Sequence, residues 1–344
     1  MKWLVTGGAG FIGTSVLRRL TKEGYQVVVL DNLSRRGVLE NLQLLQEEFQ
    51  FDFVSADVRE LDSLRKIFDK HPDTDVVLHL AAQVAVTDSI REPMHDFQVN
   101  AAGTFNLCEA IRQCAPNAIL LNASTNKVYG ELSHLKLSEK KTRYDLVNMP
   151  YGISEREPVD FRTPYGCSKG TAEQYVRDYA RTYGLRTISF RQSCIYGPHQ
   201  FGFEDQGWVA WFMIATALDK PITIYGNGKQ VRDLLFVNDL VDCYLTAVEQ
   251  IDQAMGEIYN IGGGPTNSCS VLELIGYLET VMGKKIRYSF EDWRAGDQRI
   301  FVCDIRKAMN DLGWQPTTPV IDGLGKLSKW VYDSAAIIRN VLEG

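Results

Sequence analysis

The sequence predicts an α/β fold with a doubly wound parallel sheet and a smaller C-terminal α/β lobe. In the first half of the 344 residues, short apolar runs such as YQVVVLD (25–31) and TDVVLHLAA (74–82) alternate with helical patterns. Strands that alternate with helices of about ten to fifteen residues are typical of right-handed βαβ crossovers. The runs are apolar throughout, as expected of strands that helices cover on both faces.

The composition indicates a folded protein of the cytoplasm. Hydrophobic residues make up 45% of the chain, and the net charge of −6 argues against nucleic acid as a partner, because phosphate binding needs a basic face. The seven cysteines include no CxxC pair, so we expect neither a disulfide framework nor a metal site. No apolar run has the length of a signal peptide or a membrane span, which favours a cytoplasmic location without membrane contact.

The first predicted crossover contains three spaced glycines. Gly7, Gly10 and Gly13 lie between the strand KWLVTG (2–7) and the helix FIGTSVLRRLTKEG (11–24). Glycines at this point permit a tight turn, and the helix N-terminus then faces a pyrophosphate, as in Rossmann-like folds. A glycine trio alone often marks only a turn, but its position in the first strand-to-helix connection favours a dinucleotide.

The second predicted strand ends in Asp31, eighteen residues after Gly13. A carboxylate at this position can accept hydrogen bonds from the adenosine ribose, which favours NAD over NADP. Two alternatives stay open. Arg35 and Arg36 follow closely and are suited to a 2′-phosphate, and Asp31 is also a common helix or turn cap.

The third and fourth predicted strands end in ADV (56–58) and HLAAQ (79–83). Ligands of open parallel sheets collect at these carboxyl ends. We expect Asp57 to bond the adenine amine, and Leu80, Ala81 and Ala82 to offer backbone and small side chains to the cofactor. Each segment alone is more typical of core packing than of a binding site, so the order of the pieces carries the argument.

Ser124 and Thr125 end the next predicted strand, and Tyr165 and Lys169 follow on a helix. The tyrosine and lysine are about 6 Å apart along the helix axis, on one face. A hydroxyl, a phenol and an ammonium beside a nicotinamide form a redox site for alcohols and ketones. We expect Tyr165 to act as general base with a pKa lowered by Lys169, Lys169 to hold the nicotinamide ribose, and Thr125 to donate to the substrate oxygen.

The pattern changes after about residue 190, where Gly- and Pro-marked segments become frequent. We expect an NAD-binding domain over 1–190, with segments near 231–254 returning to it, and a discontinuous nucleotide-sugar lobe mainly over 191–344. The polar stretch 137–164 lacks clear periodicity and predicts a long loop over the cleft.

Several motifs, in their order along the chain, resemble those of the extended short-chain dehydrogenase/reductase superfamily of nucleotide-sugar epimerases and dehydratases. They are TGGAGFIG (6–13), DNLS (31–34), HLAAQ (79–83), VNAAGT (99–104), VYG (128–130), the YxxxK of residues 165–169, YGNGKQVRD (225–233) and NIGGG (260–264). The resemblance implies that Thr125, Tyr165 and Lys169 are the catalytic residues and that NAD stays bound. It adds these expected cofactor contacts: Phe11, Ile12, Asn32, Ser34, Arg35, Val58, Gln83, Asn100 and Ile195.

Within the superfamily, STNKVYG (124–130) is most similar to the CDP-paratose (CDP-tyvelose) 2-epimerases. Dehydratases of the superfamily have a sequence like TDEVYG at this point, and Asn126 and Lys127 stand where they have Asp and Glu. The resemblance therefore implies inversion at C2 of a CDP-hexose through a transient ketone. A UDP-hexose 4-epimerase, another nucleotide-sugar epimerase and a redox-sensing NAD-binding protein are the alternatives.

The nucleotide sugar should be held from the smaller lobe. A guanidinium binds phosphate oxygens bidentately, so we expect Arg232 and Arg294 at the diphosphate. Asp297 is expected to orient Arg294 or meet the ribose, and Gln206 to read the base. The full expected substrate set is Ser124, Thr125, Asn126, Gln206, Arg232, Arg294 and Asp297. By resemblance, helices over 100–114 and 170–184 pair in a homodimer, and a homotetramer is the alternative.

Overall fold

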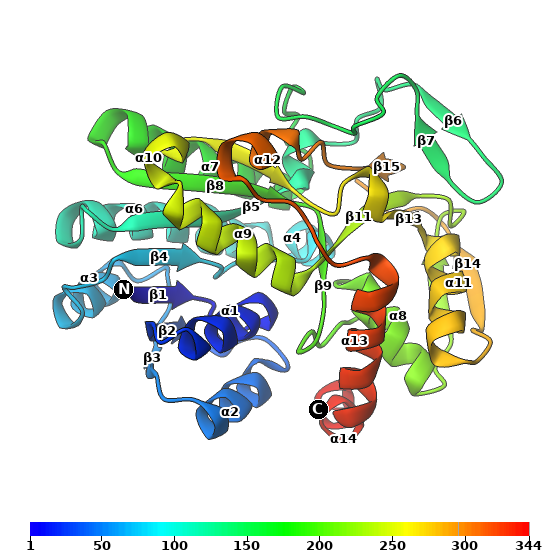
Figure 1. Cartoon of the computed structure of the whole chain (residues 1–344), viewed down its shortest axis with the longest axis horizontal. Coiled ribbons are helices and arrows are strands. Elements are labelled where there is room, and N and C mark those ends of the chain that lie inside the picture. Colours follow the sequence, from blue (N-terminus) through cyan, green and yellow to red (C-terminus); the bar gives the residue numbers. More distant parts are fainter. Residues whose placement is uncertain (295, 344) are drawn as a thin grey trace.

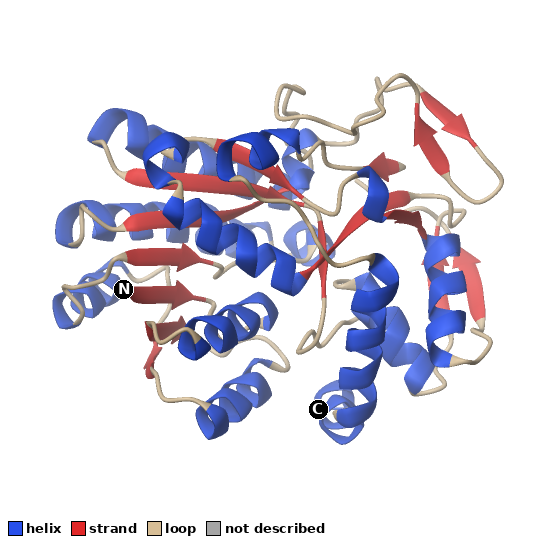
Figure 2. Cartoon of the chain, in the orientation of Figure 1, coloured by secondary structure: helices blue, strands red, loops and turns tan. Residues whose placement is uncertain are grey.

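A parallel sheet of seven strands forms the centre of the larger part of the molecule (Figures 1 and 2). The computed structural model describes residues 1–294 and 296–343. The strands of this sheet are β1 Lys2–Thr6, β2 Gln26–Asp31, β3 Asp52–Ser55, β4 Val76–His79, β5 Ile119–Thr125, β8 Arg186–Gln192 and β12 Ile258–Ile261. The sequence prediction of a doubly wound α/β fold is therefore confirmed.

The strand order is β12-β8-β5-β4-β1-β2-β3, so the winding direction reverses between β1 and β4. Val5 of β1 pairs with Val29 on one side and Leu78 on the other. A reversal of this kind opens a crevice at the carboxyl ends of the strands, where ligands of such sheets bind. In Figure 1 the carboxyl ends of the strands face the smaller lobe.

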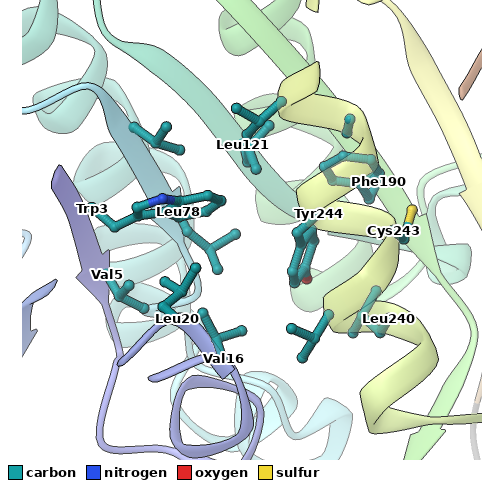
Figure 3. Close-up of a cluster of buried hydrophobic side chains, with 14 of the residues drawn as sticks. Trp3, Val5, Val16, Leu20, Leu78, Leu121, Phe190, Leu240, Cys243 and Tyr244 are labelled. Atoms are coloured by element: carbon teal, nitrogen blue, oxygen red, sulfur yellow. The ribbon is translucent and has the colours of Figure 1, made fainter. Parts of the chain in front are cut away.

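Helices cover both faces of the sheet. One face packs against α1 Phe11–Lys22, α2 Val38–Glu48, α9 Val237–Glu249, α10 Ile251–Ala254 and α12 Arg306–Leu312, and the other against α3 Leu61–Lys70, α6 Gly103–Cys114 and α7 Thr163–Tyr183. Alternate strand residues serve the two cores, since Trp3 and Val5 belong to the first and Leu4 to the second. Figure 3 shows part of the first core, where the Tyr244 ring of α9 lies among Leu78, Leu121 and Phe190.

Short elements connect β4 to α6 and β5 to α7. They are α4 Val86–Arg91, α5 Pro93–Phe97, the π-helix η1 Gln98–Ala102 and the 3₁₀ turn η2 Asn126–Tyr129. π-Helical turns are rare and occur often at functional sites. Here η1 carries Asn100, whose side-chain amide reaches Ser168 of α7.

The smaller lobe has its own apolar core. Its elements are β9 Cys194–Tyr196, α8 Trp208–Ala217, β10 Ile222–Tyr225, β11 Val231–Phe236, η3 Pro265–Asn267, β13 Ser268–Ser270, α11 Val271–Met282, β14 Tyr288–Glu291, β15 Ile300–Phe301, α13 Val320–Asp333 and α14 Ala335–Glu343. β11 pairs with β9, β13 and β15, whereas α9 and β12 belong to the large lobe. Residues 237–261 therefore pack on or pair with the large sheet, as α12 does, whereas 231–233 pair with β13 of the small lobe; the predicted domain bounds stay a prediction.

The stretch 137–164, predicted as a long loop over the cleft, contains a β-hairpin of β6 Leu137–Glu139 and β7 Tyr144–Leu146. Leu137 pairs with Leu146, and both pack on Val231 and Ile300 of the small lobe. The rest of the stretch is tied down, because the fully buried Ile153 pairs with Cys303. Each strand has only three residues, too few for its alternation to stand out in the sequence.

All seven cysteines are free thiols. Within 1–294 and 296–343, no three or more His, Cys, Asp or Glu side chains gather as metal ligands would. In the same residues, no helix combines the length and apolar composition needed to cross a bilayer.

Candidate active site

The turn between β1 and α1 has no room for side chains at two of its glycines. Gly7 has φ +68°, and a Cβ there would lie 2.7 Å from the backbone nitrogen of Ala81. A Cβ on Gly13 would lie 2.4 Å from the carbonyl oxygen of Gly8. Helix α1 begins after Gly10 with no hydrogen bond from a described side chain at its N-cap. Its first N–H groups are therefore available to an anionic ligand such as a pyrophosphate.

Asp31 lies beside this turn at the carboxyl end of β2. Its carboxylate accepts hydrogen bonds from Ala9 N at 3.2 Å and Leu33 N at 2.9 Å. Burial raises the pKa of this carboxyl, although both backbone donors oppose the rise. The structure thus gives Asp31 the turn-capping role and also places it where a cofactor ribose is expected.

The residues predicted around the adenine form hydrogen bonds and an ion pair in the region of Asp57. Asp57 forms an ion pair with Arg59 at 2.8 Å and accepts a hydrogen bond from Asn32 at 2.9 Å. The Arg59 guanidinium lowers the pKa of Asp57 to about 2. Ser34 donates to the same Asn32 side chain, while Val58 packs into the second core.

The segment after β4 is fixed to η1 and α7. Leu80 and Ala81 hydrogen-bond Thr6 of β1. Gln83 and Asn100 exchange two hydrogen bonds of 3.0 and 2.9 Å, and the Asn100 amide also reaches Ser168 of α7. Gln83 and Asn100 therefore position the loop 80–83, which includes Ala82, against the helix that carries Tyr165 and Lys169.

Thr125, Tyr165 and Lys169 converge at the carboxyl end of β5. Thr125 ends the strand, Tyr165 lies in the first turn of α7 after Pro164, and Lys169 follows one turn later. All three are buried, and the Lys169 ammonium donates to Ala123 O at 2.5 Å. The Thr125 hydroxyl donates to Asn126 Oδ1 at 3.4 Å and lowers the pKa of the Tyr165 phenol.

The pKa of Tyr165 differs from the sequence expectation. Burial raises it to about 12, and Thr125 and Arg35 only partly oppose this. Burial also lowers the pKa of Lys169 to about 8, while the Asp96 and Glu173 carboxylates favour its ammonium form. Desolvation outweighs the neighbouring charges here, because each buried group loses hydration that its few partners do not replace.

Ser124, expected at the substrate, has a structural partner. Its hydroxyl donates to Glu173 at 2.7 Å, although the residue lines the cavity. Glu173 is fully buried on α7 and forms a 2.6 Å ion pair with Arg191 of β8. Ser124 thus connects the end of β5 to the helix that carries Tyr165 and Lys169.

A cavity of about 640 Å³ opens from Thr125 and Tyr165 toward the smaller lobe. Its lining combines both lobes, with Tyr225, Trp208 and Cys194 on the small-lobe side. Cys194 accepts a hydrogen bond from the Trp208 indole. The predicted residues on the cavity wall are Phe11, Ile12, Ser124, Thr125, Asn126, Tyr165, Ile195, Gln206, Arg232, Arg294 and Asp297.

The two predicted diphosphate-binding arginines have separate carboxylate partners. Arg232 pairs with Asp297 at 2.6 Å, and Arg294 pairs with Asp205 at 3.2 Å and lies over the Tyr225 ring. Asp297 therefore orients Arg232, not Arg294 as one alternative had it.

Gln206 accepts a hydrogen bond from Arg35, which connects the small lobe to the loop after β2. No local pattern in the sequence pairs these two residues, because they lie far apart along the chain.

Lys127, Tyr225 and Asp96 are among the residues of the site that the sequence prediction did not include. Lys127 and Tyr225 line the cavity, and Asp96 is a buried carboxylate that accepts a 2.5 Å hydrogen bond from Ser168. Lys127 was recognisable, since it directly follows two predicted substrate residues. Asp96 and Tyr225 depend on long-range packing for which the sequence offers no local signal.

Comparisons with known proteins agree with this geometry. A sequence model described as the NAD dependent epimerase/dehydratase family matches residues 3–262. The chain is 44% identical to the CDP-paratose 2-epimerase of Salmonella typhi, over 96% of this chain and 99% of that one. It is 32% identical to the UDP-glucose 4-epimerase of Thermotoga maritima solved with UDP-glucose, covering 97% and 100% of the two chains with a TM-score of 0.83. The UDP-glucose 4-epimerase of Thermus thermophilus in complex with NAD matches at 30% identity, 96% and 99% coverage and a TM-score of 0.80.

Proposed function

Since the chain belongs to the NAD-dependent epimerase/dehydratase family, we propose that it inverts C2 of a CDP-linked hexose. CDP-paratose, CDP-tyvelose and CDP-glucose are the substrates we expect. The observation that carries the proposal is a cavity lined by Thr125, Tyr165, Arg232 and Arg294, with Lys169 one turn after Tyr165 on α7. The 44% identity to a CDP-paratose 2-epimerase supports the choice of base and carbon.

The residues present fit NAD. The uncapped N-terminus of α1 suits the pyrophosphate, and Gly7 and Gly13, where a Cβ would collide with neighbouring backbone, permit the tight turn that leads to it. Asp31 suits the adenosine ribose. Bound NAD would supply reversible hydride transfer at the substrate carbon, so the reaction would consume no net reductant.

The protein side chains supply proton transfer and positioning. Tyr165 removes the proton of the substrate hydroxyl as the carbon is oxidised, and Thr125 donates to the same oxygen. To accept a proton near pH 7, the phenol must lose the elevation of its pKa to about 12 that burial produces, and its pKa must fall further, below the ordinary value of about 10. The Lys169 ammonium and the positive nicotinamide ring have the charge this requires. Arg232 and Arg294 hold the diphosphate while the ketone turns its other face.

Dehydration is disfavoured by residues 126 and 127. At the positions where dehydratases carry two acidic residues, this chain has Asn126 and Lys127. The Asn126 amide donates to Gln298, and the Lys127 ammonium lines the cavity. Neither group can accept the proton that β-elimination removes while it is amide or ammonium. The reaction that remains available to Tyr165 is oxidation of the substrate carbon followed by return of the hydride to that carbon.

UDP-hexose 4-epimerisation is the second candidate, because the fold matches a UDP-glucose 4-epimerase at 32% identity over almost the whole chain. A redox-sensing NAD-binding protein is the rival from another class. A protein of this class would bind NAD but would convert no nucleotide sugar.

The decisive experiment follows CDP-glucose, CDP-paratose and UDP-glucose by NMR in D₂O with no added NAD. We expect C2 inversion of a CDP-hexose, without deuterium at the inverted carbon and without net NADH. Deuterium at C2 would indicate proton abstraction and overturn the mechanism. Inversion only at C4 of UDP-glucose would select the second candidate, and no turnover would support the redox sensor.

The exposed sides of α6 and α7 support self-association. Phe105, Tyr175 and Tyr183 are 37%, 42% and 52% exposed, and the Phe105 and Tyr175 rings pack edge to face. Apolar faces of this kind commonly mark contacts between proteins. A homodimer through these helices, or a homotetramer containing it, is the assembly that light scattering should detect.

A further inference from the structure

Lys127 is a cation that lines the cavity beside Thr125 and Tyr165. It lies in η2, two residues after Thr125, and its backbone N–H donates to the Thr125 hydroxyl oxygen at 3.2 Å. Its side chain is 22% exposed and lines the cavity together with Thr125 and Tyr165. The ammonium is thus built into the same short turn that presents the catalytic threonine.

The contacts of this ammonium within the protein are long. It donates to Gly296 O at 3.4 Å, and the Asp297 carboxylate, its only salt-bridge partner in the described parts of the chain, is 3.8 Å away. That carboxylate is already paired with Arg232 at 2.6 Å. An ammonium has three N–H donors, so donor capacity is left for a ligand.

The charged groups that face Lys127 are Arg232 from β11 and Asp297 from the segment before β15. Burial and the Arg232 charge lower the pKa of Lys127 to about 8, and Asp297 opposes this. The group is therefore an ammonium at pH 7 and loses its proton as the pH rises through about 8. A neutral amine would lose the charge-assisted character of any hydrogen bond to substrate.

Resting on the proposed function, we propose that the Lys127 ammonium binds a hydroxyl of the substrate's glycosyl group and thereby helps select the ring carbon presented to Tyr165. Arg232 and Arg294 lie toward the small lobe, each with a carboxylate partner, and suit the diphosphate. Lys127 shares its turn with Thr125, which is expected at the reacting oxygen. The ammonium consequently contacts the sugar, not the nucleotide.

Calorimetry on the full-length enzyme tests this assignment with two ligand pairs, CDP-glucose against CDP and UDP-glucose against UDP. For Lys127→Met we expect the dissociation constant of the sugar nucleotide to rise about 10- to 100-fold, as for one charged hydrogen bond. The constant for the free diphosphate should change less than about threefold. Lys127→Arg, which keeps the charge, should retain most of the wild-type difference between the dissociation constants of the sugar nucleotide and the free diphosphate.

Lys229→Met is the matched control, because Lys229 has nearly the same exposure, 23%, but pairs with Glu139 instead of lining the cavity. It should leave both constants unchanged. In wild type, sugar-nucleotide binding should weaken above about pH 8, and this loss should be absent in Lys127→Arg.

Equal weakening of sugar nucleotide and diphosphate, or no change in either, would overturn the assignment. Wild-type protein that binds only the UDP pair would contradict the CDP part of the proposed function, while the effect of Lys127→Met stays measurable on that pair.

Discussion

Tyr165 combines deep burial with a hydroxyl partner, and only its phenol oxygen is needed for the proposed reaction. Tyr165→Phe removes this oxygen and leaves the ring packing. We expect the turnover number for epimerisation to fall about 10²- to 10⁴-fold, the usual contribution of a general base. The dissociation constant for the sugar nucleotide should change little, because the diphosphate contacts remain. Both quantities are measured on the same preparation.

Tyr277→Phe is a suitable control for this change, since Tyr277 is 40% exposed on α11 and outside the cavity lining. It should retain full turnover. Undiminished activity of Tyr165→Phe would require another base and end the proposed mechanism.

At the scale of secondary-structure elements, the buried ion pair of Glu173 and Arg191 joins α7 to β8, and Glu173 also accepts a hydrogen bond from Ser124. Removing one partner of a buried ion pair leaves an uncompensated charge. We expect Glu173→Gln to lower the free energy of unfolding by about 3 to 5 kcal/mol and to reduce turnover, because the amide keeps only one of the two oxygens that accept from Ser124 and Arg191. Denaturant titration and initial rates measure the two effects.

The double variant Glu173→Gln with Arg191→Met separates charge from shape. It should be more stable than Glu173→Gln alone, since no buried guanidinium is left without a carboxylate. A double variant as unstable as the sum of the two single changes would contradict the account.

The turn between β1 and α1 gives a second prediction at this scale. Gly13→Ala places a methyl group 2.4 Å from Gly8 O, so either the turn or the start of α1 must move. We expect loss of bound NAD, measured by release of the nucleotide from denatured protein, together with a lower melting temperature. Gly276→Ala on α11, where a Cβ meets nothing within 4 Å, should keep the cofactor and gain slight helix stability. Normal NAD content in Gly13→Ala would contradict this role of the turn.

For the whole molecule, local sequence patterns predicted the strands and helices, because these elements depend on the order of apolar and polar residues along the chain. Apolar runs such as residues 74–82 predicted the sheet, because strands covered on both faces need continuous apolar side chains. The spacing of Tyr165 and Lys169 predicted one helical face. The partner of Asp297, the approach of Lys127 to Gly296 and the raised pKa of Tyr165 depend on how the segment before β15 and the cavity wall pack. No sequence period encodes such contacts.

The pH dependence of stability also belongs to the whole molecule, because buried thiols occur in both lobes. Burial raises the pKa of Cys108 and Cys194 to about 12, and the pKa values of the buried Cys243, Cys269 and Cys303 also lie well above the ordinary range. In the unfolded chain these thiols ionise near pH 9, so between about pH 9 and 12 the folded state binds more protons. Their contribution to stability is therefore complete below about pH 8 and is lost as the pH rises.

Denaturant titrations in reducing buffer should show this loss. We expect the free energy of unfolding to change little in response to the thiols between pH 7 and 8, and to fall by several kcal/mol between about pH 9 and 10.5. The lowered pKa values of Lys127 and Lys169, both about 8, have the opposite sign, since the unfolded lysines bind more protons between about pH 8 and 10.5. Five thiols outweigh two lysines, so the net slope above pH 9 should be negative. A stability that rises through pH 10 would mean that these thiols are accessible to water in the folded protein.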